Sequence, residues 1–410
     1  MKKDNSLTST IVMFLIFTSV LTAFLGAYGT GDRQFFMGWI DNAMQYGVRV
    51  GFGENHDMYP PFAPLILYVA KCIFGSVPDS SLFAIRISTA VFMLISCIVA
   101  KALFKSNKIC YLLFFSMVVS VTNGFLDIFI VPFALLAFYY ARKENYFLTG
   151  LFLSLMCLMK YQPLIIMPIV VAGFIHVGIN HKRINITWDK IGRMVIGGII
   201  PLIPVTLFYR KMFFKSIYVA LFRDSGNIAP NGLNLGWIIQ YFYELSTGGL
   251  NNGMAGIMWS VPNKAMLSFK LIFVLGYLFV FVRTLIADNK SLAYVLKNSL
   301  SVYILYYLFS VNVHENHFFC GVLLALLLYI ELGEKYNQIF YACAYMFNIN
   351  LLIFYGIWGG AEGFFRVIGG VFDPTILLAI VNVIIGMIIL RDLVFASGFD
   401  DEGTKTKSLV

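Results

Sequence analysis

The sequence predicts an all-α polytopic membrane protein with about twelve transmembrane helices, and three observations lead to this fold class. Hydrophobic residues make up 59% of the 410 residues and charged residues only 12%, about half of their share in soluble domains. Apolar runs recur along the whole chain, separated by short polar segments. Most lysines and arginines fall in those segments, so the net charge of +9 indicates membrane topology rather than nucleic-acid binding.

The apolar runs are predicted to cross the membrane alternately outward and inward. The first run follows Lys2 and Lys3, which hold the N-terminus in the cytoplasm. It is longer than the apolar part of a signal peptide, about 7–15 residues, so we interpret it as an uncleaved helix. Lys105 and Arg142 mark two of the later cytoplasmic turns. The predicted spans are residues 7–27, 82–103, 109–121, 128–140, 146–159, 164–179, 194–208, 265–285, 292–309, 318–332, 339–357 and 374–390.

Two longer polar regions interrupt this series on the extracytoplasmic side, within one predicted membrane domain of residues 1–390. Residues 28–79 form a large first loop. Its apolar end at 64–74 is too short to span a bilayer and is predicted to be an interfacial helix. Residues 209–264 are predicted to be irregular, and residues 391–410 form a short cytoplasmic tail.

Cysteine usage and nucleotide motifs give no sign of a cofactor. The six cysteines are scattered without a C-x-x-C pair, and most lie inside apolar runs, where we expect small buried side chains. The sequence has no metal-ligand spacing, Walker loop or dinucleotide fingerprint, so we expect neither a metal nor a cofactor. An activated donor would then arrive through the membrane.

Chemically active residues gather in four polar clusters, all predicted to lie on the extracytoplasmic side. Ionisable groups at membrane depth are costly and usually face a cavity or a partner, so four clusters at one face predict a shared site. The clusters are the loop 31–64 with Asp32, Asp41, His56, Asp57 and Tyr59; NGFLD at 123–127 with Asp127; KYQP at 160–163 with Lys160 and Gln162; and HENH at 314–317 with His314, Glu315 and His317.

These residue types suit the transfer of a sugar from a lipid phosphate to a hydroxyl group. A carboxylate can remove the hydroxyl proton as the sugar bond forms, and cations stabilise the charge that grows on the leaving phosphate. The ring of Tyr59 can stack on a sugar. Simpler roles stay open: Asp32 could cap a helix, Lys160 could extend its apolar stem to the interface, and His314 could pair with Glu315.

The order of the clusters resembles that of the GT-C superfamily of polytopic glycosyltransferases, which take sugars from polyprenyl or dolichyl phosphate. The motifs that carry the resemblance are GDRQFFMGW at 31–39, with an early acidic residue; DMYPP at 57–61, for D-Y-P-P; NGFLD at 123–127, for G-Q-x-D; KYQP at 160–163, for K-P-Q-P; NIAPNGLNLGW at 227–237, for N-A-x-N-x-W; and HEN at 314–316, for H-E-K or H-E-R. Met58 is an insertion, and the Gln of the third motif and the basic residue of the last are missing. The resemblance covers roughly residues 8–330.

The resemblance implies a role for each cluster. Asp32 would be the general base or would help to position the acceptor. Asp127 would be a second catalytic carboxylate that supports it or helps to bind a cation or the acceptor. Lys160 and His314 would bind the donor phosphate. The implied substrate-binding residues are Asp41, His56, Asp57, Tyr59, Gln162, Asn231, Glu315 and His317.

The implied function is that of a membrane hexosyltransferase whose partners are the lipid bilayer, a polyprenyl-phosphate-linked sugar donor and a glycan or lipid acceptor. It would act by a single inverting displacement on the extracytoplasmic face of a bacterial inner membrane, in surface-polysaccharide or O-antigen modification. Two alternatives stay open. A flippase or transporter of lipid-linked glycans would show inverted repeats and charges near the bilayer midplane. A polysaccharide polymerase or ligase would rely on arginines in a large external loop.

Overall fold

The computed structural model describes residues 7–27, 29–55, 59–178, 183–222, 228–247, 263–288, 290–356 and 372–395. The chain falls into two compact units, each drawn from separate stretches of sequence. The first unit consists of Met1–Leu164, Thr187–Ser225 and Phe347–Phe364. The second consists of Ile165–Ile186, Gly226–Met346 and Phe365–Val410.

The described residues are almost entirely helical, and five of their helices are long and apolar enough to cross a membrane. The chain is therefore an all-α membrane protein, as its sequence predicts, whereas the figure of about twelve spans stays a prediction. The five helices are α5 (Ser80–Phe104), α10 (Trp188–Tyr209), α13 (Asn263–Ile286), α14 (Leu292–Phe309) and α17 (Thr375–Phe395).

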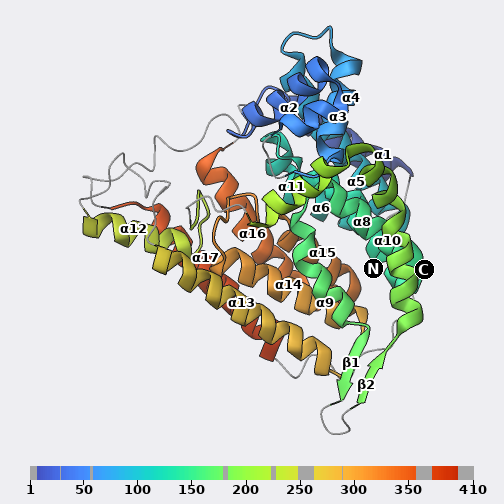
Figure 1. Ribbon diagram of the computed structural model, residues 1–410. Coiled ribbons are helices and arrows are strands. Elements are labelled where there is room, and N and C mark those ends of the chain that lie inside the picture. Colours follow the sequence, from blue (N-terminus) through green and yellow to red (C-terminus); the bar gives the residue numbers. More distant parts are fainter. Residues whose placement is uncertain are drawn as a thin grey trace. The chain divides into compact units, whose positions relative to one another are not determined.

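The first unit contains most of the N-terminal helices. Besides α5 and α10 they are α1 (Leu7–Ala23), α2 (Arg33–Tyr46), α3 (Val48–Glu54), α4 (Phe62–Phe74), α6 (Asn107–Thr122), the 3₁₀ helix η1 (Leu126–Ile130), α7 (Val131–Arg142), α8 (Tyr146–Met159) and α11 (Lys211–Phe222). Short polar side chains fix two of the helix starts, because Ser106 accepts a hydrogen bond from Ile109 N and Asn145 accepts one from Leu148 N. The helices α2, α3 and α4 gather at one end of the unit (Figure 1).

Helices α8 and α10 cross with almost no side chain between them. A Cβ atom at Gly150 would overlap the backbone of Met194, and one at Gly197 would overlap the carbonyl of Phe147. Only glycine allows two helices to approach so closely. This crossing holds α8, whose C-terminal end carries Lys160.

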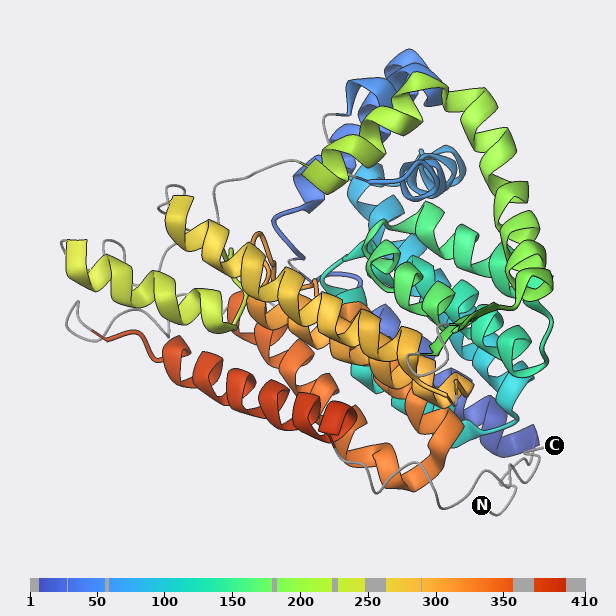
Figure 2. The same cartoon turned by 60° about the horizontal axis from the view of Figure 1, so that its bottom comes forward.

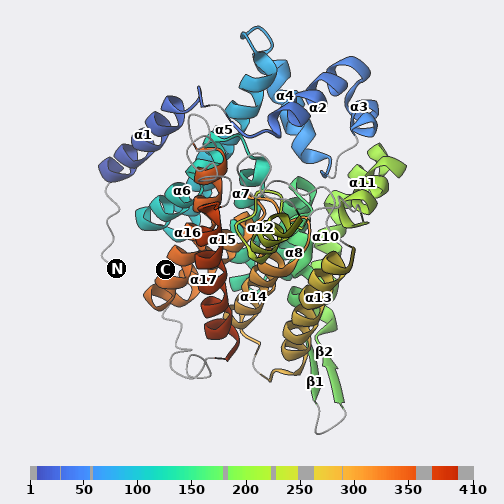
Figure 3. The ribbon, with the colours of Figure 1, turned by 90° about the vertical axis from the view of Figure 1, so that its left-hand side faces the viewer.

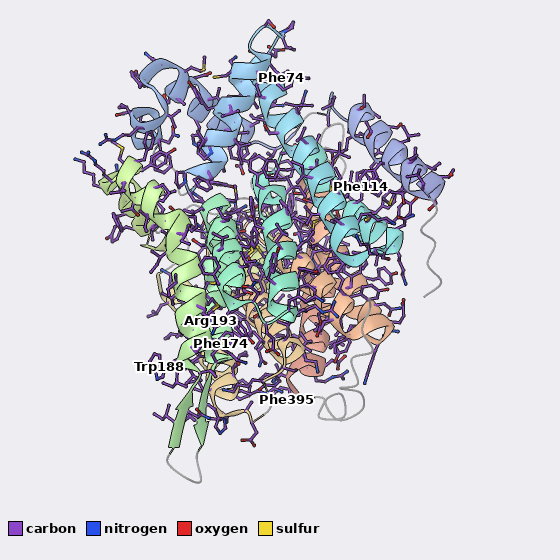
Figure 4. All side chains as sticks on the ribbon, turned by 90° about the vertical axis from the view of Figure 1, so that its right-hand side faces the viewer. Phe74, Phe114, Phe174, Trp188, Arg193 and Phe395 are labelled. Carbon is purple, nitrogen blue, oxygen red and sulfur yellow. The ribbon has the colours of Figure 1, made fainter. Side chains whose placement is uncertain are left out.

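Helix α1 is the first helix of the first unit, and α11 is the last helix of its middle stretch, Thr187–Ser225. The ring of Phe17 in α1 stacks on that of Phe114 in α6, with centroids 4.0 Å apart. Figure 4 labels Phe114 on α6. Helix α11 follows α10 after a sharp bend (Figure 2). The bend lies at Arg210, whose backbone has φ 51° and ψ −130°.

The second unit combines helices with a short β-hairpin. Besides α13, α14 and α17 it contains the end of the 3₁₀ helix η2 (Gln162–Ile166), α9 (Met167–Ala172), strands β1 (Ile175–Gly178) and β2 (Arg183–Ile186), α12 (Leu235–Thr247), α15 (Phe319–Leu332), η3 (Gly333–Tyr336) and most of α16 (Asn337–Phe354). The strands pair antiparallel, with Ile175 opposite Ile186. The hairpin lies beside the C-terminal end of α13, where His176 Nδ1 is 3.1 Å from the carbonyl oxygen of Ala287 (Figure 3).

Three predicted segments differ from the structure. The predicted sixth span, 164–179, instead forms the end of η2, then α9 and β1, because Pro163 and Pro168 lack the amide donors that a long helix needs. The region 209–264, predicted to be irregular, contains α11 and α12 in its described part. Helix α17 continues to Phe395, past the predicted start of the tail at 391.

Candidate functional site

Segments that are distant in sequence meet in the first unit. Thr30 N donates a 2.8 Å hydrogen bond to the carbonyl of Asn123, which joins the loop after α1 to the turn after α6. Lys160, directly after α8, reaches Asp127 in η1. The first contact ties the residue before the first predicted cluster to the second cluster, and the second contact joins the second cluster to the third.

Asp127 and Lys160 form a buried ion pair. The Lys160 ammonium lies 2.5 Å from Asp127 Oδ1, Asp127 is fully buried, and Lys160 is 5% exposed. Extended backbone at Lys160, with φ −156° and ψ 140°, ends α8 at this point. Either charge alone would carry a large desolvation cost in this apolar setting. Each residue therefore depends on the other.

Tyr59 adds an aromatic surface to the ion pair. Its ring centroid lies 5.4 Å from the Lys160 ammonium, within cation–π range. The ring also packs 4.9 Å from the ring of Trp39 and 5.9 Å from that of Phe36, both in α2. Helix α2 and the turn before α4 thus hold Tyr59 against Lys160.

Burial and charge shift two pKa values in this cluster. Burial around its hydroxyl group raises the pKa of Tyr59; the Lys160 ammonium opposes this rise, and the carboxylates of Asp127 and Asp32 add to it. Burial alone would lower the pKa of Lys160, but the Asp127 carboxylate and Tyr59 outweigh it and raise that pKa. At neutral pH Lys160 is therefore a cation and Tyr59 a neutral phenol.

Asp32 supplies a second carboxylate to this cluster. It is half-buried directly before α2, and its backbone N–H donates a 3.2 Å hydrogen bond to Thr30 Oγ1. Its side chain makes no capping hydrogen bond to α2, so the simpler capping role is not observed. Its charge acts on the pKa of Tyr59. Asp32 is thus the more accessible of the two carboxylates near Tyr59.

The other candidates of the first unit have different surroundings. Asp41 is exposed in α2, where its carboxylate accepts a 3.3 Å hydrogen bond from Ser81 Oγ. Gln162 opens η2, and its side-chain carbonyl oxygen is buried without a hydrogen-bond partner among the described residues. His56 and Asp57 lie outside the described residues.

The fourth predicted cluster belongs to the second unit. His314 and His317 follow α14, and their rings lie 5.0 Å apart. His317 Nδ1 is 2.9 Å from the hydroxyl oxygen of Tyr306. Glu315 is only 2% exposed. This cluster combines a buried carboxylate with two half-buried imidazoles.

Asn231 lies in a loop of the second unit that side chains hold in place. Its backbone has φ 56°, in the left-handed region that asparagine tolerates better than most residues. Gln240 bonds both the N–H and the carbonyl of Ala229, at 2.7 Å and 3.2 Å. Val313 N donates to the carbonyl of Ile228 at 3.3 Å. The loop therefore lies against the segment that leads into the fourth cluster.

The structure divides the predicted site residues between the two units. The first unit holds Asp32, Asp41, Tyr59, Asp127, Lys160 and Gln162, and the second holds Asn231, His314, Glu315 and His317. A single site made from all four clusters stays a prediction, as do the roles of these residues. Within the described ranges, His, Cys, Asp and Glu side chains form no group of three or more that could hold a metal ion.

Sequence reasoning missed the residues that hold the loop around Asn231. Gln240 binds Ala229 as described, and Asn382 Nδ2 in α17 donates a 3.0 Å hydrogen bond to the carbonyl of Leu233. Both amides are buried, Gln240 in the amphipathic helix α12 and Asn382 in the mostly apolar helix α17. A polar side chain in such a helix usually has a partner, and this is the signal that points to them.

The sequence matches no model of a known protein family and no curated protein.

Proposed function

We propose that this chain is a membrane glycosyltransferase that moves a hexose from a polyprenyl-phosphate sugar to a hydroxyl group of a glycan or lipid acceptor. The observation that carries the proposal is the grouping of Asp32, Tyr59, Asp127 and Lys160 in the first unit. It supplies an accessible carboxylate and a cation held in an apolar setting. Sugar transfer from a phosphate to a hydroxyl needs both functions.

In the proposed reaction the acceptor oxygen attacks the anomeric carbon of the donor sugar. The bond between that carbon and the phosphate oxygen breaks, and its electron pair stays on the lipid phosphate. Asp32 takes the proton of the attacking hydroxyl group. Because attack comes from the face opposite the leaving group, the anomeric configuration inverts.

Lys160 would stabilise the charge that grows on the departing phosphate. An ammonium group has three donors, so its hydrogen bonds to Asp127 and Tyr59 leave one donor for a phosphate oxygen. The raised pKa of Lys160 keeps it charged throughout.

For Asp127 we propose a positioning role in place of the catalytic role implied by the resemblance. Its carboxylate is fully buried and bonded to Lys160, so an acceptor hydroxyl group reaches Asp32 more readily. Asp127 would fix the lysine side chain and keep it protonated.

The proposed setting is the extracytoplasmic face of a bacterial inner membrane, in surface-polysaccharide or O-antigen modification. Basic residues in the short turns support this orientation. In the second unit, His314 keeps the donor-binding role that the resemblance implies.

The test is the substitution Asp32→Asn in the purified chain, supplied with radiolabelled polyprenyl-phosphate glucose or mannose and a candidate acceptor. We expect transfer to fall by about 100-fold or more, because a general base contributes roughly that factor. The melting temperature should not change, since Asn has nearly the same shape. Glu54→Gln, at an exposed carboxylate of α3, is the matched control and should keep wild-type turnover.

Wild-type turnover by Asp32→Asn would exclude Asp32 as the base. If the unmodified chain forms no new glycosidic bond but carries lipid-linked glycans across vesicle membranes, the glycosyltransferase proposal fails and the transporter alternative replaces it.

A further inference from the structure

Helix α11 has one buried face and one exposed face. One face packs into the core of the first unit: Phe213 is 4% exposed, and Ser216 lies 2.6 Å from the hydroxyl oxygen of Tyr161. Phe213 joins a buried cluster that includes Phe52, Leu158, Tyr161, Val205 and Tyr209. This face fixes the rotation of α11 about its own axis.

The other face is an exposed stripe of alternating basic and aromatic residues. Lys211, Phe214, Lys215 and Tyr218 follow the i, i+3, i+4, i+7 spacing of one helix face, and all four are exposed. Phe214 is 57% exposed and Tyr218 66% exposed. We call these four residues the α11 stripe.

The preceding helix sets the depth of the stripe relative to a membrane. Helix α10 is a candidate span, and after the exposed charges of Asp189 and Arg193 in its first turns its exposed surface is apolar from Val195 to Phe208. The next exposed residues are Arg210 and Lys211, after which the chain bends into α11 (Figure 2). This change from apolar to basic marks the boundary between hydrocarbon and headgroups.

The two positive charges of the α11 stripe favour binding of an anion. Lys211 and Lys215 are four residues apart on one helix face, a spacing at which like charges repel. Aromatic residues such as Phe214 are favoured at the headgroup level of a bilayer. A lysine near such a surface attracts anionic headgroups. We propose that the α11 stripe lies in the headgroup layer and selects lipids with an anionic phosphodiester headgroup. This inference does not depend on the proposed sugar transfer.

The test uses the full chain in nanodiscs of equal phosphatidylcholine and phosphatidylglycerol, with p-benzoylphenylalanine in place of Phe214. After irradiation, mass spectrometry measures which lipid is attached. We expect phosphatidylglycerol adducts to exceed phosphatidylcholine adducts by about 5- to 30-fold, because each of the two lysines near the surface contributes up to roughly 1 kcal/mol. The double variant Lys211→Gln/Lys215→Gln should return this ratio towards one.

Two controls separate the stripe from general effects. The same probe at Ile199, an exposed position midway along α10, should give equal adducts of both lipids. Lys105→Gln/Lys143→Gln removes two exposed lysines elsewhere in the first unit and should leave the ratio at position 214 unchanged.

Three results would overturn the proposal. They are an equal ratio of the two lipids at position 214 in the chain with both lysines, a ratio that survives Lys211→Gln/Lys215→Gln, and adducts only to protein. The equal ratio and the adducts only to protein are measured on the chain that keeps both lysines. Both results can therefore be obtained even if the double variant does not fold.

Discussion

Asp127 and Lys160 neutralise each other inside the first unit, so the effect of substituting either residue depends on whether its partner remains. Asp127→Asn or Lys160→Met alone should lower the free energy of unfolding by about 3–5 kcal/mol, because each leaves one buried charge unpaired. The double variant should lose much less than the sum, since no buried charge remains. Chemical unfolding of all four proteins in detergent completes the double-mutant cycle.

Additive losses in that cycle would mean that the two residues do not act as a pair. Sugar transfer gives a separate readout. The double variant should stay inactive even where its stability recovers, because the proposed role of Lys160 requires its charge.

Tyr59 makes the stability of the folded chain depend on pH in the alkaline range. Its pKa is raised in the folded chain, so above its ordinary value of about 10 the unfolded chain loses the phenol proton while the folded chain keeps it. The stability that depends on this proton is complete below about pH 10 and falls as the pH rises further. The raised pKa of Lys160 acts in the same direction.

We therefore expect the melting temperature of the wild-type chain to fall more steeply above about pH 10 than that of Tyr59→Phe. Thermal unfolding from about pH 8 to about pH 11 measures both slopes. Tyr46→Phe removes an exposed hydroxyl group from the end of α2 and should follow the wild type. Equal slopes for wild type and Tyr59→Phe would contradict the prediction.

At the scale of elements, the crossing of α8 and α10 depends on glycine. Gly150→Leu should force the helices apart, because even a Cβ atom at this position overlaps the backbone of Met194. We expect a loss of about 3 kcal/mol or more in stability and a loss of transfer, since α8 carries Lys160. Gly192→Ala in α10 meets nothing within 4 Å and should be neutral or slightly stabilising. Thermal unfolding of both variants measures the two changes in stability. Equal stability of Gly150→Leu and Gly192→Ala would contradict the prediction.

Apolar run length predicts most of the helices well and fails where other forces set the local structure. The predicted span 146–159 coincides with α8, and 292–309 coincides with α14, because polar residues bound both runs. The run 164–179 misleads because it is apolar apart from His176, although Pro168 starts a new short helix and Ile175 pairs with Ile186. Pairing between strands depends on a partner that hydropathy does not reveal.

Helices α11 and α12 are not predicted from apolar run length, for a different reason. Both are amphipathic helices among Gly- and Asn-rich stretches, and neither forms a long apolar run. Their stability comes from packing one face onto a core, as Phe213 does in α11. Such a face is visible only once its partner surface is known.

At the scale of the whole molecule, the positions of the turns predict which residues are exposed on each side of the membrane. In the first unit Asp127 and Lys160 lie at one end of the helix pair α7 and α8, and Lys143 lies in the turn at the other end. Lys143→Cys should react with an impermeant maleimide only after the cells are permeabilised. Gln34→Cys, near Asp32, should react in intact cells. Both variants need a Cys72→Ser background, because Cys72 is exposed whereas the other cysteines are buried or half-buried. Labelling of Lys143→Cys in intact cells would show that the chain has the opposite orientation in the membrane.

The candidate site is predictable from the sequence in its residue types and only partly in its contacts. Asp32, Tyr59, Asp127 and Lys160 are all named by their motifs, but the pairing of Asp127 with Lys160 is not, because 33 positions separate them along the chain. Nor does the sequence show that Asp127 is fully buried, which changes its proposed role. Side-chain burial depends on how η1 packs, and composition does not determine that.

The ion pair also affects how the chain is made. Asp127 leaves the ribosome well before Lys160, and a lone carboxylate is costly in lipid. We expect the segment between them, α7 and α8, to enter the bilayer together as a hairpin whose two charges meet during insertion. A chain that stops before Lys160 should therefore keep an uncompensated acid in this segment and insert less completely than a chain that includes Lys160.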